Sequence, residues 1–300
     1  MKHTLIAAVT NYREVHKVQN FVYSWQWKCS QNSKLIVLYD YESEITEFLW
    51  KFPGVELVQK ERAHLNGYLN RFAWFAETID SLNVEEGSLV LTADIRDVVF
   101  QSDPFEAMEE LLKDGADLVV IDEGITNEEE WNAKMMSEAF PDKFEQMRQK
   151  NVMNCGVIGG KSQQVAQVCR EIFELGKKAK NETFETETLK DALVVCDQPA
   201  FGIYIHEKAD KKALAIQDNQ GHFCLTMSIA PMTNKMLYVI DGKLSNDNGE
   251  HYCIVHQYDR FAQSGIHWHT DVNEFYFYSK EGEEPLWDFA IDCKAEGLPG

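Results

Sequence analysis

The sequence predicts an α/β fold in which one central mixed, mostly parallel sheet is flanked by helices. Apolar runs of strand length alternate with helical patterns through the first half of the chain, which predicts right-handed βαβ units. The residues from Leu89 up to Asp94 are mostly apolar, as expected of a strand that is buried on both faces. With 300 residues, of which 44% are apolar, the chain is long enough to bury a large core.

The first half supplies four expected strands and the helices between them. Strands are expected at 5–9, 35–39 and 55–58 and in the run that ends at Asp94. A helical spacing of apolar residues begins at Val15, a short helix covers 45–50, and a longer one carries Arg71 and ends near Leu82. A further helix is expected to start at Asp103, because Asp is a good cap and Pro104 suits the first helical position.

The second half is more mixed and completes a single unit. The predicted order is a strand at 117–121, a polar and acidic helical segment, a strand at 152–160 broken by glycines, a helix capped by Ser162, a helix at 189–195, and short strands at 214–216, 223–225, 237–240 and 252–255. We therefore expect one domain over 1–260, consisting of a nucleotide-binding half (1–125), a helical insertion (126–150) and an acceptor half (151–260), followed by an aromatic-rich extension (261–300) packed on it.

Composition excludes several classes of function. The formal net charge is -20, so general binding to nucleic acid or to an anionic membrane is not expected. The seven cysteines are scattered and form no CxxC pair, which favours buried reduced thiols over a disulfide framework or a zinc site. No apolar run is long enough for a signal sequence or a membrane span, so we expect a cytoplasmic protein.

The acidic end of the strand from Leu89 is the main candidate site. Asp94 and Asp97 lie at its carboxyl end, where open α/β sheets bind ligands, with Arg96 between them. Two nearby carboxylates there suit a hard divalent cation that also holds a phosphate. The alternative is that both acids only form a turn through local hydrogen bonds to the backbone.

Taken in order, four segments and one later residue resemble the GT-A glycosyltransferases. The segments are Thr10-Asn11-Tyr12, Asp94-Ile95-Arg96-Asp97, Asn154-Cys155-Gly156 with the glycines after it, and Asp197-Gln198. The resemblance implies a Rossmann-like nucleotide-sugar fold and a Mn²⁺ (or Mg²⁺) site formed by Asp94, Asp97 and His256. The acids are three residues apart rather than two. Either both reach the metal through a bulged turn, or only one does and Arg96 contacts the diphosphate.

The resemblance also assigns roles around the donor. Thr10, Asn11 and Tyr12 would form the base pocket, and Tyr39 and Asp40 would face the base or its ribose. Arg71 would clamp the diphosphate, for which a guanidinium is well shaped, although it could instead be a surface arginine. Asn154 and Gly156 would line the sugar and acceptor pocket. Asp197 and Gln198 would lie beside the reacting sugar carbon, unless Asp197 only caps a helix.

These observations predict a metal-assisted hexosyltransferase. It would move a hexose from a nucleotide-diphosphate sugar, with UDP as the expected nucleotide, to a glycan or another hydroxyl acceptor. Asp197-Gln198, together with the lack of an obvious general base, favours retention of the anomeric configuration. Two alternatives remain: a nucleotidyltransferase that uses the same acidic strand end, and a non-catalytic protein of the same fold that binds carbohydrate or nucleotide.

Overall fold

The computed structural model describes most of the chain up to residue 258 and three strands beyond it. The described residues are 3–10, 14–64, 66–82, 87–180, 195–218, 221–233, 238–240 and 243–258, together with the backbone of 266–269, 274–278 and 285–290.

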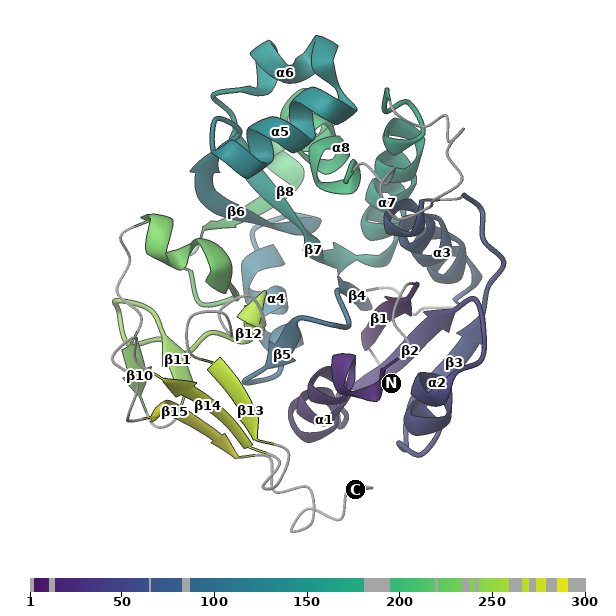
Figure 1. The fold of residues 1–300 in the computed structure, drawn as a ribbon, viewed down its shortest axis with the longest axis vertical. Helices are drawn as coiled ribbons and strands as arrows, with labels where there is room; N and C mark the ends of the chain where they lie inside the picture. Colours follow the sequence, from purple (N-terminus) through teal and green to yellow (C-terminus); the bar gives the residue numbers. More distant parts are fainter. Residues whose placement is uncertain are drawn as a thin grey trace.

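A seven-stranded mixed sheet forms the centre of the molecule (Figure 1). Its order is β3 (Val55–Gln59), β2 (Ser33–Tyr39), β1 (His3–Val9), β4 (Leu89–Ala93), β7 (Asn151–Lys161), β6 (Leu118–Thr126) and β8 (Leu214–Asp218). Neighbouring strands run parallel except at β7, which is antiparallel to both β4 and β6. The fold class predicted from the sequence is therefore confirmed.

Helices cover both faces of this sheet because its strands are apolar on both sides. In β1, Leu5 and Ala7 belong to one hydrophobic cluster, whereas Ile6 and Ala8 belong to the other. The first cluster includes residues of α1 (Gln19–Lys28), α2 (Glu44–Leu49) and α4 (Pro104–Leu112). The second includes residues of α3 (Gly67–Ser81), α5 (Glu130–Ala139), α6 (Pro141–Met147), α7 (Ser162–Gly176) and α8 (Asp197–Ile203).

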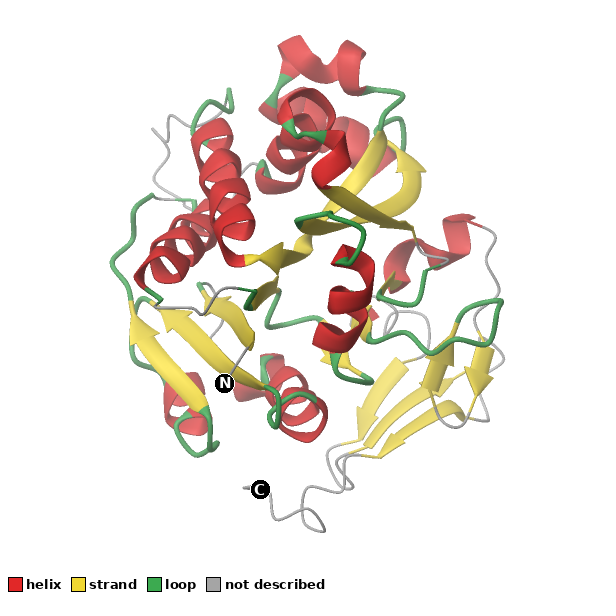
Figure 2. Cartoon of the chain, turned by 180° about the vertical axis from the view of Figure 1, so that it is seen from behind, coloured by secondary structure: helices red, strands yellow, loops and turns green. Residues whose placement is uncertain are grey.

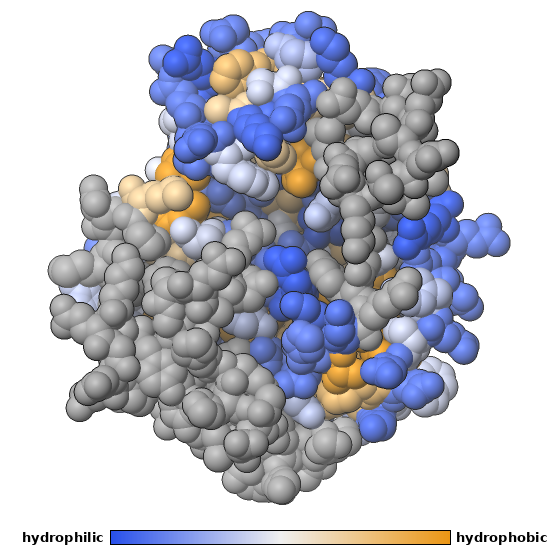
Figure 3. All heavy atoms as spheres, viewed as in Figure 1, coloured by the Kyte–Doolittle hydropathy of each residue, from blue (hydrophilic) through white to orange (hydrophobic). Residues whose placement is uncertain are grey.

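Local sequence signals explain some helix starts and not others. Asp103 caps α4 as predicted, since its side chain accepts a 2.9 Å hydrogen bond from the Phe105 amide. The prediction that Ser162 caps α7 is wrong: Ser162 is the first helical residue, and Lys161 occupies the capping position without a side-chain bond. The helices α5 and α6 lie within the segment predicted to be helical, and the α5–α6 end of the molecule is largely hydrophilic (Figure 3).

A smaller three-stranded sheet attaches to the main one and determines where the site lies. It contains β5 (Val98–Phe100), β12 (Ile254–His256) and β9 (Cys224–Thr226), in the order β5-β12-β9. The apolar residues after Asp97 therefore do not continue β4; they pair with β12 instead, and His256 lies opposite Val98. This pairing brings a residue from late in the chain to the end of β4.

The remaining described elements are short (Figure 2). They are the 3₁₀ segments Val15–Lys17, Lys211–Ala213 and Met227–Thr233, the π segment Tyr204–Lys208, the pair β10 (Tyr238–Ile240) and β11 (Lys243–Ser245), and the antiparallel strands β13 (Ile266–His269), β14 (Glu274–Tyr278) and β15 (Pro285–Ala290). The helix predicted at 189–195 falls almost entirely outside the described residues. In the described part of the chain, no helix combines the length and apolar character needed to cross a membrane.

Candidate functional site

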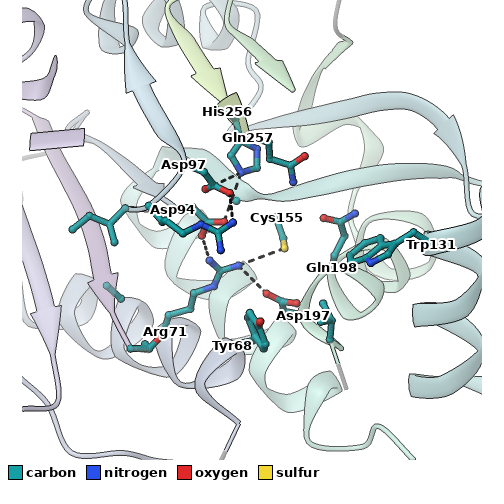
Figure 4. Close-up of a pocket in the computed structure, with 16 residues that line it drawn as sticks. Tyr68, Arg71, Asp94, Asp97, Trp131, Cys155, Asp197, Gln198, His256 and Gln257 are labelled. Atoms are coloured by element: carbon teal, nitrogen blue, oxygen red, sulfur yellow. Dashed lines mark hydrogen bonds and ion pairs between the residues drawn. The ribbon is translucent and has the colours of Figure 1, made fainter. Parts of the chain in front are cut away.

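The three predicted metal ligands come together at the carboxyl end of β4. One ligand atom from each of Asp94, Asp97 and His256 lies within 4.8 Å of the other two (Figure 4). Nε2 of His256 is 3.6 Å from Oδ2 of Asp94 and 3.6 Å from Oδ1 of Asp97. The structure thus places two carboxylates and one imidazole around a single small volume.

A turn at residues 95–97 brings the two carboxylates to the same place despite their spacing. Ile95 is 1% exposed, so its apolar side chain anchors the middle of the turn in the core. The Asp97 carbonyl accepts a 2.7 Å hydrogen bond from the Gln257 amide, and the Asp94 amide donates 2.8 Å to the Gly156 carbonyl. Gln257 has a φ of 59°, a strained value for a non-glycine residue that is common at functional sites. The turn therefore lets both carboxylates face the same small volume.

The cluster fits a divalent cation on two further observations. Nε2 of His256 is buried and has no hydrogen-bond partner among the described residues, and it faces the two carboxylates. A Cβ added to Gly156 would lie 2.6 Å from that nitrogen and 2.9 Å from Oδ2 of Asp94, so glycine keeps the space beside both ligands open. Two carboxylate oxygens and one imidazole nitrogen form a donor set suited to Mn²⁺.

Asn154 supports this cluster from behind. It is fully buried, and its amide nitrogen donates to Glu123 Oε1 at 2.8 Å and to Thr226 Oγ1 at 3.2 Å. The same nitrogen lies 2.9 Å from Nδ1 of His256, while Oδ1 accepts from the Gly156 amide at 2.8 Å. Asn154 is not among the residues that line the pocket, and its amide lies against Nδ1 of His256.

Two arginines pair with the acids of the site. Arg71, on α3, contacts Asp94 and holds Asp197 Oδ2 at 2.8 Å (Figure 4). Its side chain is only 14% exposed, so the alternative of a surface arginine is wrong. Arg96 is 2.9 Å from Oδ2 of Asp97. Both guanidiniums line the pocket and provide positive charge beside the cluster.

Asp197 and Gln198 begin α8 on the opposite side of the same pocket. Cys196 occupies the capping position and Asp197 is the first helical residue, so the interpretation of Asp197 as a helix cap is wrong. Gln198 donates a 3.2 Å hydrogen bond to Asn132 of α5. Cys155 also lines the pocket, and desolvation by burial raises the pKa of its thiol well above the ordinary value, so it stays protonated near neutral pH.

The other predicted residues are less closely grouped. Thr10 lines the pocket, whereas Asn11 and Tyr12 lie outside the described residues. Asp40 does not line it. Asp40 instead pairs with Arg62, which also donates to the Thr10 carbonyl at 3.2 Å, beside an open hollow lined by residues 40–41 and 59–62. Tyr39 is half-buried and packs against the core.

Sequence reasoning missed several residues at or near the pocket. Tyr68 and Trp131 line it, Glu123 holds Asn154, and Arg62 bridges the ends of β1 and β2. Tyr68 precedes Arg71 by one helical turn, so the spacing alone puts Tyr68 on the same helix face as Arg71. Trp131 follows a run of three glutamates, within the segment that the sequence predicts to be polar, acidic and helical.

Comparison with known proteins relates the chain to a glycosyltransferase by structure. No family model and no curated protein sequence matches it. Among solved structures, the galactosyltransferase LgtC in complex with donor and acceptor sugar analogues superposes with a TM-score of 0.54 at 12% identity, covering 93% of this chain and 92% of LgtC. A second LgtC structure, of an active-site mutant, gives a TM-score of 0.49 at 12% identity and covers 85% of this chain and 87% of that one. The chain therefore has the GT-A glycosyltransferase fold.

Proposed function

We propose that this protein is a glycosyltransferase that moves a hexose from a nucleotide-diphosphate sugar, with UDP as the expected nucleotide, to a hydroxyl acceptor. The observation that carries the proposal is the convergence of Asp94, Asp97 and His256 beside Gly156, at the carboxyl end of β4. In open α/β sheets this edge is the ligand-binding edge. The resemblance of the fold to LgtC, whose structure contains donor and acceptor sugar analogues, supports the same class of reaction.

The main electrostatic requirement of this reaction is to stabilise the negative charge that develops on the departing nucleoside diphosphate. A Mn²⁺ or Mg²⁺ ion held by Asp94, Asp97 and His256 would stabilise that charge as a Lewis acid. Arg71 and Arg96 lie beside the same carboxylates and can bind diphosphate oxygens through planar, bidentate contacts. The donor phosphates would then lie between the two guanidiniums and the cluster.

Asp197 and Gln198 are proposed to contact the transferred sugar. Asp197 is buried, and its contact with Arg71 holds a carboxylate at the wall of the pocket. A carboxylate there can stabilise positive charge that develops at the anomeric carbon, which suits a retaining reaction. Gln198 offers an amide to sugar hydroxyls.

Thermal unfolding with nucleotides and metals tests the proposal. UDP and Mn²⁺ together should raise the melting temperature, because a ligand that binds only the folded state at a hundred times its Kd stabilises that state by about 2.7 kcal/mol. Release of nucleoside diphosphate from a UDP-hexose would then establish glycosyl transfer or hydrolysis. Pyrophosphate release would indicate nucleotidyl transfer instead. No shift with any nucleoside diphosphate, with or without metal, contradicts the donor site.

A second candidate is metal-independent nucleotide binding without catalysis. Both carboxylates of the cluster already have a guanidinium partner, since Arg71 pairs with Asp94 and Arg96 with Asp97. In this case UDP alone would raise the melting temperature, Mn²⁺ would add nothing, and no UDP-sugar would be consumed.

A further inference from the structure

Trp131 lies at the rim of the pocket although its residue type is usually well buried. It stands in the first turn of α5 and lines the same pocket as Asp94 and Asp197. Its exposure is 43%. Figure 4 shows the indole next to Gln198, on the side of the pocket away from the cluster of Asp94, Asp97 and His256.

The helix that carries Trp131 is held firmly against the site. The neighbouring Asn132 accepts a 3.2 Å hydrogen bond from Gln198 of α8. Its backbone amide and its side-chain amide both donate to Oε2 of Glu129, at 2.9 and 2.8 Å. The helix α5 also buries Met136 and Ala139 in the second hydrophobic cluster. The indole is therefore exposed on a packed helix.

Exposed tryptophans elsewhere on the surface provide the contrast. Trp50 is 74% exposed, and Trp27 is 39% exposed with the Lys28 ammonium 3.6 Å from its ring centre. Isolated apolar residues on a surface are normal and need no functional explanation. Among the described tryptophan side chains, Trp131 is the one that is exposed and also lines the pocket.

We propose that Trp131 is the stacking platform of the acceptor subsite and that the acceptor ends in an uncharged pyranose. This rests on the proposed function. A pyranose has an apolar C–H face, which can pack on an aromatic ring, and a hydroxyl edge, which can bond to the amide of Gln198. Its place on the side of the pocket away from Asp94, Asp97 and His256 suits this role, because the acceptor approaches the sugar and not the diphosphate.

The charge near Trp131 favours a neutral acceptor. Trp131, Gln198 and Val195 all line the pocket and carry no charge. Glu129 and Glu130 directly precede Trp131 and add negative charge beside this rim. An acceptor with a carboxylate or phosphate on its terminal residue would be repelled there and would gain no cation partner from these lining residues.

The test uses three variants of the full chain and a panel of simple acceptors. Trp131→Ala removes the platform, Trp131→Phe keeps a smaller one, and Trp50→Ala removes an exposed indole on α2's C-terminal side as the control. Acceptors are methyl glycosides of neutral hexoses and the methyl glycoside of N-acetylneuraminic acid. Binding of each is followed by tryptophan fluorescence in the presence of UDP and Mn²⁺, and the acceptor KM is measured separately in turnover with a UDP-hexose and Mn²⁺. Trp131→Ala should raise the KM for a neutral glycoside roughly tenfold, as expected for the loss of one aromatic contact.

The donor side separates failure of this inference from failure of the proposed function. All three variants should keep the wild-type melting-temperature shift with UDP and Mn²⁺, which also shows that they fold. Trp131→Phe should lie between Trp131→Ala and wild type, and Trp50→Ala should match wild type. An unchanged acceptor KM in Trp131→Ala would contradict the stacking role of Trp131. The same conclusion would follow if the wild-type protein bound no glycoside although UDP and Mn²⁺ still raised its melting temperature. A lower KM for the N-acetylneuraminic acid glycoside than for the neutral glycosides would contradict the proposal of an uncharged acceptor. If UDP and Mn²⁺ did not raise the melting temperature of the wild-type protein, the proposed function itself would be contradicted.

Discussion

At Gly156 the absence of a side chain shapes the proposed metal site. A Cβ there would lie 2.5 Å from Cε1 of His256, closer than real Cβ contacts allow, and 2.9 Å from Oδ2 of Asp94. Gly156→Ala is therefore expected to abolish the stabilisation by Mn²⁺ and UDP and most of the turnover while the chain still folds. Gly202→Ala is the matched control, because its added Cβ would meet only Met147 Cε, at 3.9 Å. An unchanged Mn²⁺-dependent shift in Gly156→Ala would show that the ion binds elsewhere.

Asp94 and Asp97 should both be needed if both carboxylates hold the cation. Asp94→Asn and Asp97→Asn are each expected to lower turnover by roughly 100-fold or more, because each replaces an anionic ligand of the cation that would stabilise the leaving diphosphate. Steady-state kinetics with a UDP-sugar over a Mn²⁺ series measures this effect. Asp80→Asn serves as the control, since Asp80 pairs with Arg170 at the surface. Either site variant with full activity would remove that residue from the ligand set.

The sequence predicted individual site residues best where position along a strand decides location. Asp94 and Asp97 could be placed because they follow the carboxyl end of a buried strand, where open α/β sheets bind ligands, whereas His256 was assigned only through the resemblance to the GT-A family. Trp131 and Glu123 could not, because their roles depend on how the insertion and β6 pack beside distant residues such as Gln198 and Asn154. No local pattern encodes that packing.

The strand β7 shows the same limit for a whole element. Its glycines suggested a broken strand, yet the strand is continuous over Asn151–Lys161. The glycines serve close approach instead: a Cβ at Gly160 would lie 2.3 Å from the Asp117 carbonyl oxygen, and Gly160 has a φ of 153°. The glycines in the sequence indicated an unusual backbone here. The reason for it, the close approach of Asp117 just before β6, lies 43 residues away along the chain.

Gly160→Ala should therefore weaken β7 at its junction with β6. The added methyl group meets backbone atoms, which cannot rotate away, and the φ value is unfavourable for alanine. We expect the free energy of unfolding to fall by about 1–3 kcal/mol, measured by urea denaturation. Gly202→Ala, within α8, should leave it unchanged or raise it. Equal stability of Gly160→Ala and wild type would contradict this account of the strand.

For the whole molecule, the sequence predicted one central sheet flanked by helices but not the smaller sheet β5-β12-β9 beside it. The sequence shows an apolar run that ends at Asp94 and apolar residues again at 98–100, but it does not show that the turn at residues 95–97 leads from the seven-stranded to the three-stranded sheet. Pairing of β5 with β12 spans more than 150 residues of chain, a separation that local periodicity does not report. The candidate site lies at this junction.

The buried thiols give the whole molecule a predictable response to alkaline pH. Six cysteines are buried and form no disulfide among the described residues, and desolvation by burial raises the pKa of Cys169 to about 12 from an ordinary value of 9.0. The folded protein therefore keeps this proton where the unfolded chain loses it. Because the unfolded state then binds fewer protons, the free energy of unfolding falls as pH rises above about 9, by up to about 1.4 kcal/mol per pH unit for each such group.

Cys169→Ala should remove the contribution of one thiol to that slope. Urea denaturation at pH values from 7 to 10.5 is expected to show a wild-type stability that is level below the unfolded pKa and declines above it, with a shallower decline in the variant. Val168→Ala is the matched control, because Val168 is the neighbouring, fully buried residue on α7 and cannot titrate. Its truncation should lower stability equally at every pH, since it changes packing and not proton binding. If Cys169→Ala and wild type decline with the same slope, the Cys169 thiol ionises as readily in the folded state as in the unfolded chain, and burial does not control its charge.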